Sequence, residues 1–212
     1  MLSAVDGALR QTGWPVDDYW NHNTAYHAWL IDIAARHHGH VLDVGCGEGL
    51  LVQRIAAVSR SVVGLDSDPL SVQRAWGRLR STANVSVELM GFENFDAEKH
   101  SFDVITFVAS IHHLPLRESL QKARQMLRPG GELAIVGLSA NKTIADWTWA
   151  VLCTPAARLG SWLHRETRNI GVAVAEPRES LGEIRRVVDD VLPGAVIRRG
   201  LYYRYRLLWR NC

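Results

Sequence analysis

The sequence predicts an α/β fold around a mostly parallel sheet, and three observations lead to this fold class. Residues 41–58 begin as a short buried strand, pass through a glycine-rich turn and continue with helical periodicity. Apolar strand-like runs then alternate with helical periodicity as far as residue 138, which is typical of strand–helix–strand units. Residues 195–210 alternate between apolar and polar side chains, as expected of an antiparallel hairpin with one buried face.

Length and composition indicate one globular domain spanning residues 1–212. Apolar residues make up 47% and charged residues 22% of the 212-residue chain, so it can bury a sizeable core. The net charge of +2 gives no strong footprint for a phosphate backbone, so we expect no nucleic-acid partner. The N-terminus has no apolar targeting segment and the three cysteines fit reduced thiols, so we expect a cytoplasmic protein.

The first element is expected to be a helix that starts from a cap at Asp17 or Asp18. Apolar residues from Tyr26 to Ile33 recur at helical spacing, and a histidine-rich stretch at 37–40 closes the helix. These histidines lack a second ligand cluster at metal-binding spacing, so we expect no metal site. Cationic side chains at a helix C-terminus are the simpler explanation.

The remaining elements follow in alternation. Strands are expected at 41–44, 61–66, 85–90, 103–109 and 132–138, and helices at 50–59, 69–79, 116–127 and 181–191. Asp68 and Pro69 predict the start of one helix, and residues 128–131 predict a type II turn. Residues 143–164 are interrupted by Pro155 and Gly160, so they predict two short helices, too broken to span a membrane.

The glycine turn is the stretch that points to a ligand. Gly45, Gly47 and Gly49 follow Asp43 at every second position, which gives D-x-G-x-G-x-G rather than the dinucleotide spacing G-x-G-x-x-G. Glycines allow backbone amides to approach a ligand closely, because no Cβ intervenes. An acid placed before them suits a cationic or amine-bearing ligand better than a pyrophosphate.

This turn resembles motif I of the class I S-adenosylmethionine-dependent methyltransferases. Residues 61–69, 101–114 and 127–138 resemble the second, fourth and fifth strands of that family, in the same order. The resemblance implies a Rossmann-like, doubly wound, mostly parallel seven-stranded sheet with an antiparallel C-terminal strand and a helical insertion after strand five. It divides the single domain into an N-terminal helix (1–38), a cofactor-binding core (39–138), an insertion (139–178) and a C-terminal helix with hairpin (179–212).

The resemblance also implies S-adenosylmethionine as cofactor and S-adenosylhomocysteine as product. Asp43 would reach the α-amine, and Asp66, at the tip of the second strand, would accept both ribose hydroxyls. The structural alternative is that Asp43 caps a turn and Asp66 belongs to an Asx-turn. The expected cofactor contacts are Asp43, Gly45, Cys46, Gly47, Gly49, Leu65, Asp66, Ser67, Gly91, Phe92, Ala109, Tyr19, His22 and Tyr26.

The sequence departs from the family pattern after the third strand. Gly91 stands where the family carries an acid that binds the adenine amino group. Phe92, the next residue, is expected to cover the adenine and to offer its backbone amide, and Glu93 is a candidate replacement for the missing acid.

The segment at 19–30 resembles the HNxxYH segment that precedes motif I in small bacterial methyltransferases, where an N-terminal helix lies over the cofactor. Tyr19, His22, Tyr26 and His27 would then form a lid with their polar tips toward the cofactor or the acceptor. The alternative is that Tyr26 is a core residue and the histidines are solvated.

Two histidines after the fourth strand are the candidates for acid–base chemistry. A hydroxyl acceptor loses a proton as it is methylated, and imidazole is the side chain that titrates near neutrality. His113 is expected to be the base, and His112 to pack against the next helix. If the acceptor is an amine or thiol that is already nucleophilic, both histidines are structural.

The expected function is methyl transfer to a small, partly apolar molecule, at oxygen or nitrogen, by direct in-line displacement. The loop after the fourth strand lacks the Asn/Asp-Pro-Pro-aromatic motif of base methylation. The tryptophans at 147, 149 and 162 are expected to cover the acceptor, and the alternative is that they are ordinary core residues. The alternatives are a nicotinamide-dependent redox enzyme, which the glycine spacing disfavours, and a non-catalytic S-adenosylmethionine-binding module. The sequence is compatible with a homodimer.

Overall fold

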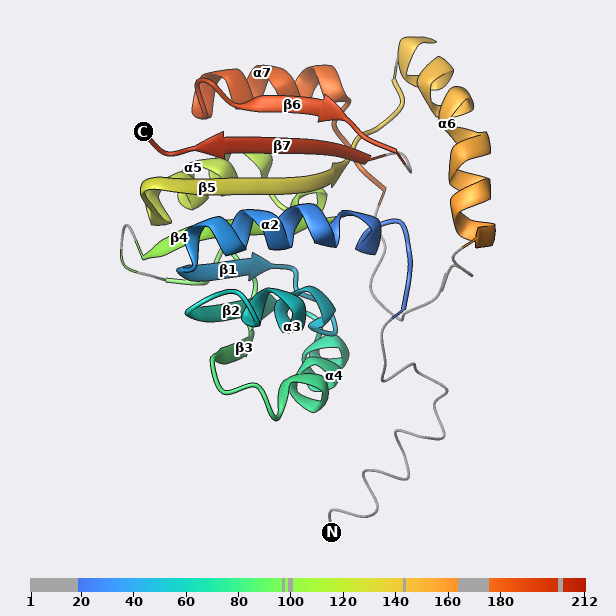
Figure 1. Cartoon of the computed structure of the whole chain (residues 1–212). Coiled ribbons are helices and arrows are strands. Elements are labelled where there is room, and N and C mark those ends of the chain that lie inside the picture. Colours follow the sequence, from blue (N-terminus) through green and yellow to red (C-terminus); the bar gives the residue numbers. More distant parts are fainter. Residues whose placement is uncertain (1–18, 97, 99–100, 143, 164–175, 202–203) are drawn as a thin grey trace.

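Seven strands form one mixed sheet in the order β3-β2-β1-β4-β5-β7-β6. The computed structural model describes residues 19–96, 98, 101–142, 144–163, 176–201 and 204–212 (Figure 1). The strands are β1 (His40–Val44), β2 (Ser61–Asp66), β3 (Val85–Leu89), β4 (Phe102–Val108), β5 (Leu127–Leu138), β6 (Val196–Arg199) and β7 (Arg204–Arg210). The first five strands are parallel, and β7 runs antiparallel to β5 and β6. The predicted fold class is confirmed.

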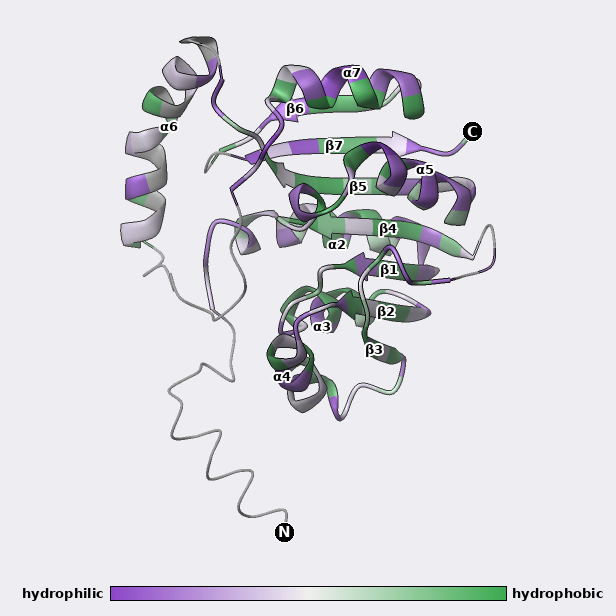
Figure 2. Ribbon diagram, turned by 180° about the vertical axis from the view of Figure 1, so that it is seen from behind, coloured by the Kyte–Doolittle hydropathy of each residue, from purple (hydrophilic) through white to green (hydrophobic). Residues whose placement is uncertain are grey.

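Helices cover both faces of the sheet and bury a separate hydrophobic cluster on each. α2 (His27–His37), α3 (Leu50–Ala56) and α4 (Pro69–Leu79) pack on one face, and α2 lies in front of the sheet in Figure 1. α5 (Leu116–Met126) and α7 (Leu181–Val191) pack on the other face, which Figure 2 shows from behind. Successive strand residues alternate between the clusters, so Leu42 joins the α5–α7 side and Val41 the α2 side.

The sheet order determines where a site can form. The chain reverses direction across the sheet between β1 and β4, which are neighbours although β2 and β3 lie between them in sequence. In doubly wound sheets, ligands bind at such a switch point, beyond the carboxyl ends of the strands. These ends are Val44 of β1, Asp66 of β2 and Val108 of β4.

The first helical segment begins close to Tyr26, where its predicted apolar periodicity begins. A short 3-10 turn, η1 (Thr24–Tyr26), leads directly into α2, and His38 ends α2 with a left-handed φ of 48°. The side-chain oxygen of Asn21 accepts the backbone amides of Asn23 and Thr24, at 2.9 and 3.0 Å. Asn21 therefore does the capping expected of Asp17 or Asp18, which lie outside the described residues.

Residues 144–163 of the insertion after β5 form one continuous helix, α6 (Ile144–Leu163), so the prediction of two short helices in this stretch is wrong. Pro155 lies inside the helix, where it cannot donate to the carbonyl of Val151. Both residues are on the exposed side of α6, so water can hydrate that carbonyl and the helix continues. Figure 1 places α6 beyond the carboxyl ends of the parallel strands.

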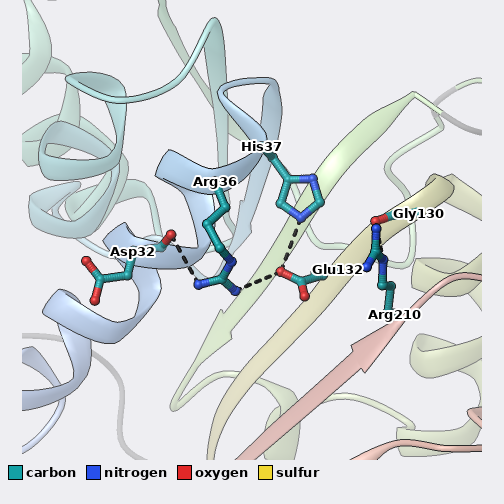
Figure 3. Close-up of polar contacts among 6 residues, drawn as sticks. All are labelled: Asp32, Arg36, His37, Gly130, Glu132 and Arg210. Atoms are coloured by element: carbon teal, nitrogen blue, oxygen red, sulfur yellow. Dashed lines mark hydrogen bonds and ion pairs between the residues drawn. The ribbon is translucent and has the colours of Figure 1, made fainter.

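The opposite end of the sheet is held by a polar cluster around Glu132, which lies within β5 where that strand pairs with the start of β4 (Figure 3). The Glu132 carboxylate accepts hydrogen bonds from Arg36 at 3.0 Å and from His37 at 3.1 Å, both on the last turn of α2. Arg210 of β7 donates to the Gly130 carbonyl at 3.2 Å. These contacts anchor the C-terminus of α2 at the far end of the sheet, which leaves its N-terminal end beside the strand ends that carry the site.

Candidate active site

The glycine turn after β1 is tied to the end of β2 by backbone hydrogen bonds. The amides of Gly45 and Cys46 both donate to the carbonyl of Leu65, at 2.8 and 2.9 Å. Gly45 has a φ of 74°, and a Cβ at this position would collide with the Cβ of Ser110 in the loop after β4. Only glycine satisfies both demands, so Gly45 allows the β1, β2 and β4 loops to meet.

Asp66 at the tip of β2 holds two loops through its carboxylate. One oxygen accepts the amide of Gly47 at 2.8 Å, and the other accepts the amide of Asp68 at 2.9 Å. Asp68 in turn caps α4, since its carboxylate accepts the Ser71 amide at 2.9 Å. Each oxygen of Asp66 retains a lone pair, so the carboxylate is oriented in advance to accept two further donors.

Asp43 is a buried carboxylate at the end of β1. Its side chain accepts a hydrogen bond from the hydroxyl of Thr106 on the neighbouring strand β4, at 2.7 Å. Burial raises the pKa of Asp43 to about 7, the Thr106 hydrogen bond opposes this shift, and the charge of Asp66 adds to it. A cationic ligand beside this buried carboxyl group stabilises its ionised form.

A buried ion pair holds the glycine turn against α4. Glu48 lies within the turn and pairs with Arg78 of α4 at 3.1 Å, and both side chains are less than a tenth exposed. Arg78 also donates to the Glu48 carbonyl at 3.2 Å. The Tyr19 hydroxyl donates to the Glu48 carboxylate, and burial together with this negative charge raises the pKa of Tyr19. Tyr19 therefore reaches the glycine turn, where its hydroxyl is a hydrogen-bond donor to Glu48.

Two further residues of the expected lid, His22 and Tyr26, contact the C-terminal half of the chain, whereas His27 is buried with its Nδ1 2.9 Å from Arg54 of α3. The Tyr26 hydroxyl donates to the Leu201 carbonyl at 2.6 Å, and the ring is buried. His22 Nε2 lies 3.0 Å from the Ser161 hydroxyl of α6, and Asn23 accepts two hydrogen bonds from Arg204. Tyr26 thus directs its hydroxyl toward the β6–β7 connection rather than toward the glycine turn, while His22 connects the segment to α6.

The loop after β4 carries the two candidate bases. Ala109 has a left-handed φ of 52°, which is strained for a residue with a side chain, and its amide donates to the Val136 carbonyl at 2.8 Å. His112 and His113 belong to the short helix η2 (Ile111–His113), and their ring centroids lie 4.2 Å apart. His112 is partly buried and His113 is exposed, so His113 is the more accessible of the two.

Several expected cofactor contacts have side chains that point elsewhere. Leu65 is in the core, and the Cys46 side chain packs against Gly64. Phe92 is also buried, edge-on to Phe107 at 5.4 Å, so its ring cannot cover an adenine at the strand ends. These residues can contact a cofactor only through their backbones. Ser67 is exposed beside Asp66, where a side-chain contact remains open.

Sequence reasoning missed four residues that shape the site. Glu48 and Arg78 fix the glycine turn, Thr106 holds Asp43, and Ser110 fills the space left by Gly45. Thr106 carried a usable signal, because it is a polar residue inside the otherwise apolar run VITFVA at 104–109. The pairing of Glu48 with Arg78 joins positions thirty residues apart and has no local pattern.

The doubly wound sheet with a glycine turn at its switch point defines a class of nucleotide-binding α/β protein, and comparison with known proteins identifies the family. A family model described as a methyltransferase domain matches residues 41–131. An uncharacterized methyltransferase of Mycobacterium tuberculosis is 34% identical over 202 residues, which cover 92% of this chain and 98% of the relative. A ubiquinone biosynthesis O-methyltransferase of Xanthomonas oryzae is 35% identical over 116 residues, 53% of this chain and 47% of that protein.

Among solved structures, the N-methyltransferase NodS from Bradyrhizobium japonicum, in complex with S-adenosyl-L-homocysteine, shares the fold. Its TM-score is 0.62 at 20% identity, and the match covers 93% of this chain and 91% of NodS. The chain belongs to the class I S-adenosylmethionine-dependent methyltransferases, and S-adenosylmethionine is its cofactor.

No helix in the described part of the chain combines the length and hydrophobicity needed to cross a membrane. No group of three or more histidine, cysteine or acidic side chains there is arranged to bind a metal ion.

Proposed function

We propose that the protein methylates a small, partly apolar acceptor at oxygen or nitrogen, with a hydroxyl group as the favoured acceptor. The observation that carries this proposal is the position of His113, which is exposed on the loop after β4, next to the β1 end that carries Asp43. The ubiquinone biosynthesis O-methyltransferase among the relatives supports oxygen as the acceptor atom.

The cofactor is assigned to the carboxylates at the ends of β1 and β2. Asp43 binds the α-ammonium group, because a cation stabilises the ionised carboxylate that burial disfavours. Asp66 accepts the ribose hydroxyls on the lone pairs that the Gly47 and Asp68 amides leave open. When bound, S-adenosylmethionine supplies a methyl group on a cationic sulfur. Methyl transfer then depends chiefly on positioning, since a neutral thioether leaves without protonation.

The binding site for the acceptor is assigned to α6 and to residues 19–26, which lie at the same end of the sheet (Figure 1). Asp146 of α6 pairs with Arg199 of β6 at 2.6 Å, and His22 approaches Ser161 near the other end of α6. Trp149 is partly covered by Arg199, whose guanidinium lies 5.9 Å from the ring. All three predicted tryptophans are exposed, and Trp149 is the least exposed of them, at 38% against 60% for Trp147 and 76% for Trp162, so it is the best placed of the three to line an acceptor site.

The acceptor class is tested first with a panel of small phenols, catechols and amines and a labelled methyl donor. We expect transfer to at least one hydroxylated or amine acceptor with an apolar part, in reactions that need no nucleic acid. Tight, salt-sensitive binding to RNA or DNA together with transfer to it would contradict the proposal, because such binding reflects phosphate contacts.

Cofactor affinity should depend on pH through Asp43. A cationic ligand binds the ionised carboxylate, so binding releases a proton wherever Asp43 is protonated in the free protein. With a pKa of about 7, affinity should rise about tenfold from pH 6 to pH 8 and level off above. Titration calorimetry with S-adenosylmethionine measures this.

Two variants identify the group responsible for this pH dependence. Asp43→Asn should bind weakly at every pH without the rise. Thr106→Val should move the rise to higher pH, since the hydrogen bond that stabilises the ionised form is lost, whereas Thr106→Ser should retain the wild-type profile. An Asp43→Asn protein with the same pH profile as wild type would refute the role of Asp43.

The role of His113 is tested by His113→Asn once an acceptor is known. Loss of a general base should lower kcat about 10²–10⁴-fold while the cofactor affinity stays unchanged. His112→Asn is the matched control on the adjacent, partly buried ring. A loss below fivefold for His113→Asn would show that the acceptor is already nucleophilic when it arrives.

A further inference from the structure

One face of α6 packs against the rest of the molecule. Asp146 and Cys153 are buried, and Ser161 is half-buried where it contacts His22. These three residues of α6 recur at intervals of about two helical turns, so they lie on one side of the helix. The Asp146 carboxylate pairs with Arg199 of β6 at 2.6 Å, which fixes the N-terminal end of this side. The opposite side of α6 therefore points away from the sheet.

The outward side of α6 is apolar. It carries a line of residues spaced every three or four positions, which we call the outer stripe: Trp147, Val151, Pro155, Leu159 and Trp162. Pro155 is exposed, and each of the other four is more than half exposed. At a rise of about 1.5 Å per residue, the outer stripe extends about 22 Å along the helix.

This concentration of apolar surface is specific to α6. Six of the eleven large hydrophobic side chains that are exposed among the described residues belong to this one helix. Single exposed apolar residues are normal on a protein surface, whereas a contiguous line of them marks a surface that binds something. Figures 1 and 2 both place α6 at the edge of the molecule, so the outer stripe is accessible to a large partner.

The charges of α6 divide between its two sides. Residues 144–163 contain two charged side chains, Asp146 and Arg158. Asp146 lies on the packed side and is paired with Arg199. Arg158 is exposed and lies four residues before Trp162, so its guanidinium borders the outer stripe. A partner of this surface must therefore offer apolar groups together with an anion.

A second copy of the chain matches this surface poorly. Around a two-fold axis the outer stripe would face itself, and each copy would bring its own Arg158 into the interface. The outer stripe holds no carboxylate to pair with the partner's arginine, so two like charges would be desolvated together. An anionic lipid surface supplies both requirements, acyl chains for the apolar residues and phosphate groups for the guanidinium.

We propose that the outer stripe of α6 docks the protein on the surface of an anionic lipid bilayer, with the helix axis parallel to that surface. Trp147 and Trp162, at the two ends of the stripe, enter the boundary between acyl chains and head groups, where tryptophan is favoured. Arg158 pairs with a lipid phosphate. Docking would bring the acceptor site assigned to α6 beside the bilayer, from which an apolar acceptor reaches it directly; this consequence alone rests on the proposed function.

The proposal is tested by cosedimentation of the full chain with vesicles of phosphatidylglycerol and phosphatidylcholine in equal parts. Wild type should bind these vesicles at least fivefold more tightly than vesicles of phosphatidylcholine alone, because Arg158 meets an anion only in the former. Trp147→Ser combined with Trp162→Ser should lower the affinity at least tenfold, since two large apolar groups are removed. Trp76→Ser is the matched control, because Trp76 is an exposed tryptophan on α4, and it should bind as wild type does.

A second pair of variants isolates the charge. Arg158→Glu should weaken binding to the anionic vesicles about tenfold and leave binding to phosphatidylcholine vesicles within twofold, whereas Arg158→Lys should bind like wild type. Trp147, Trp162 and Arg158 are exposed, so the melting temperatures of these variants should match that of wild type.

Three results would overturn the proposal. The first is a wild-type protein that binds neither kind of vesicle, and the second is a Trp147→Ser/Trp162→Ser protein that binds vesicles as wild type does. The third is a wild-type dimer in analytical ultracentrifugation that the same double variant dissociates, which would assign the outer stripe to a second copy. These measurements involve no methyl transfer, so failure of this inference is distinct from failure of the proposed function.

Discussion

The site depends on the meeting of three strand-end loops around a turn that only glycine can form. Gly45 brings the β1 turn against Ser110 of the β4 loop, and the Gly45 and Cys46 amides fasten it to the Leu65 carbonyl of β2. Asp66 completes the arrangement by accepting the Gly47 amide. Because these contacts join neighbouring strands of one sheet, the acidic groups are held in fixed relative positions before any ligand arrives, which lowers the entropic cost of binding.

The same geometry gives the carboxylates different tasks. Asp43 is buried and linked to Thr106, so its charge state responds to a cation. Asp66 is partly exposed and already accepts two amides, so its remaining lone pairs suit hydroxyl donors. Burial and backbone contacts thus distinguish two acids that lie on adjacent strands.

The sequence predicted the sheet well because its signals are local: apolar runs for the strands, Asp68 and Pro69 for the start of α4, and alternation for β7. The predictions from sequence failed where exposure or a contact between residues far apart in the chain determines the structure. Pro155 suggested a helix break, but α6 continues because the position is exposed. The directions of Tyr26 and Phe92 depend on Leu201 and Phe107, which no local pattern reveals. The positions of Asp43 and Asp66 at the strand ends followed from the motif, whereas the Glu48–Arg78 pair did not.

The central claim is that these strand ends bind S-adenosylmethionine through Asp66, and calorimetric titration of the Asp66→Ala variant tests it most directly. Two charge-assisted hydrogen bonds are removed, so affinity should fall at least tenfold relative to wild type. Asp32→Ala, which removes an exposed carboxylate on α2, is the control and should bind normally. The Asp66→Ala protein must also unfold cooperatively, because Asp66 holds the Gly47 and Asp68 amides. Unchanged affinity in a folded Asp66→Ala protein would contradict the account.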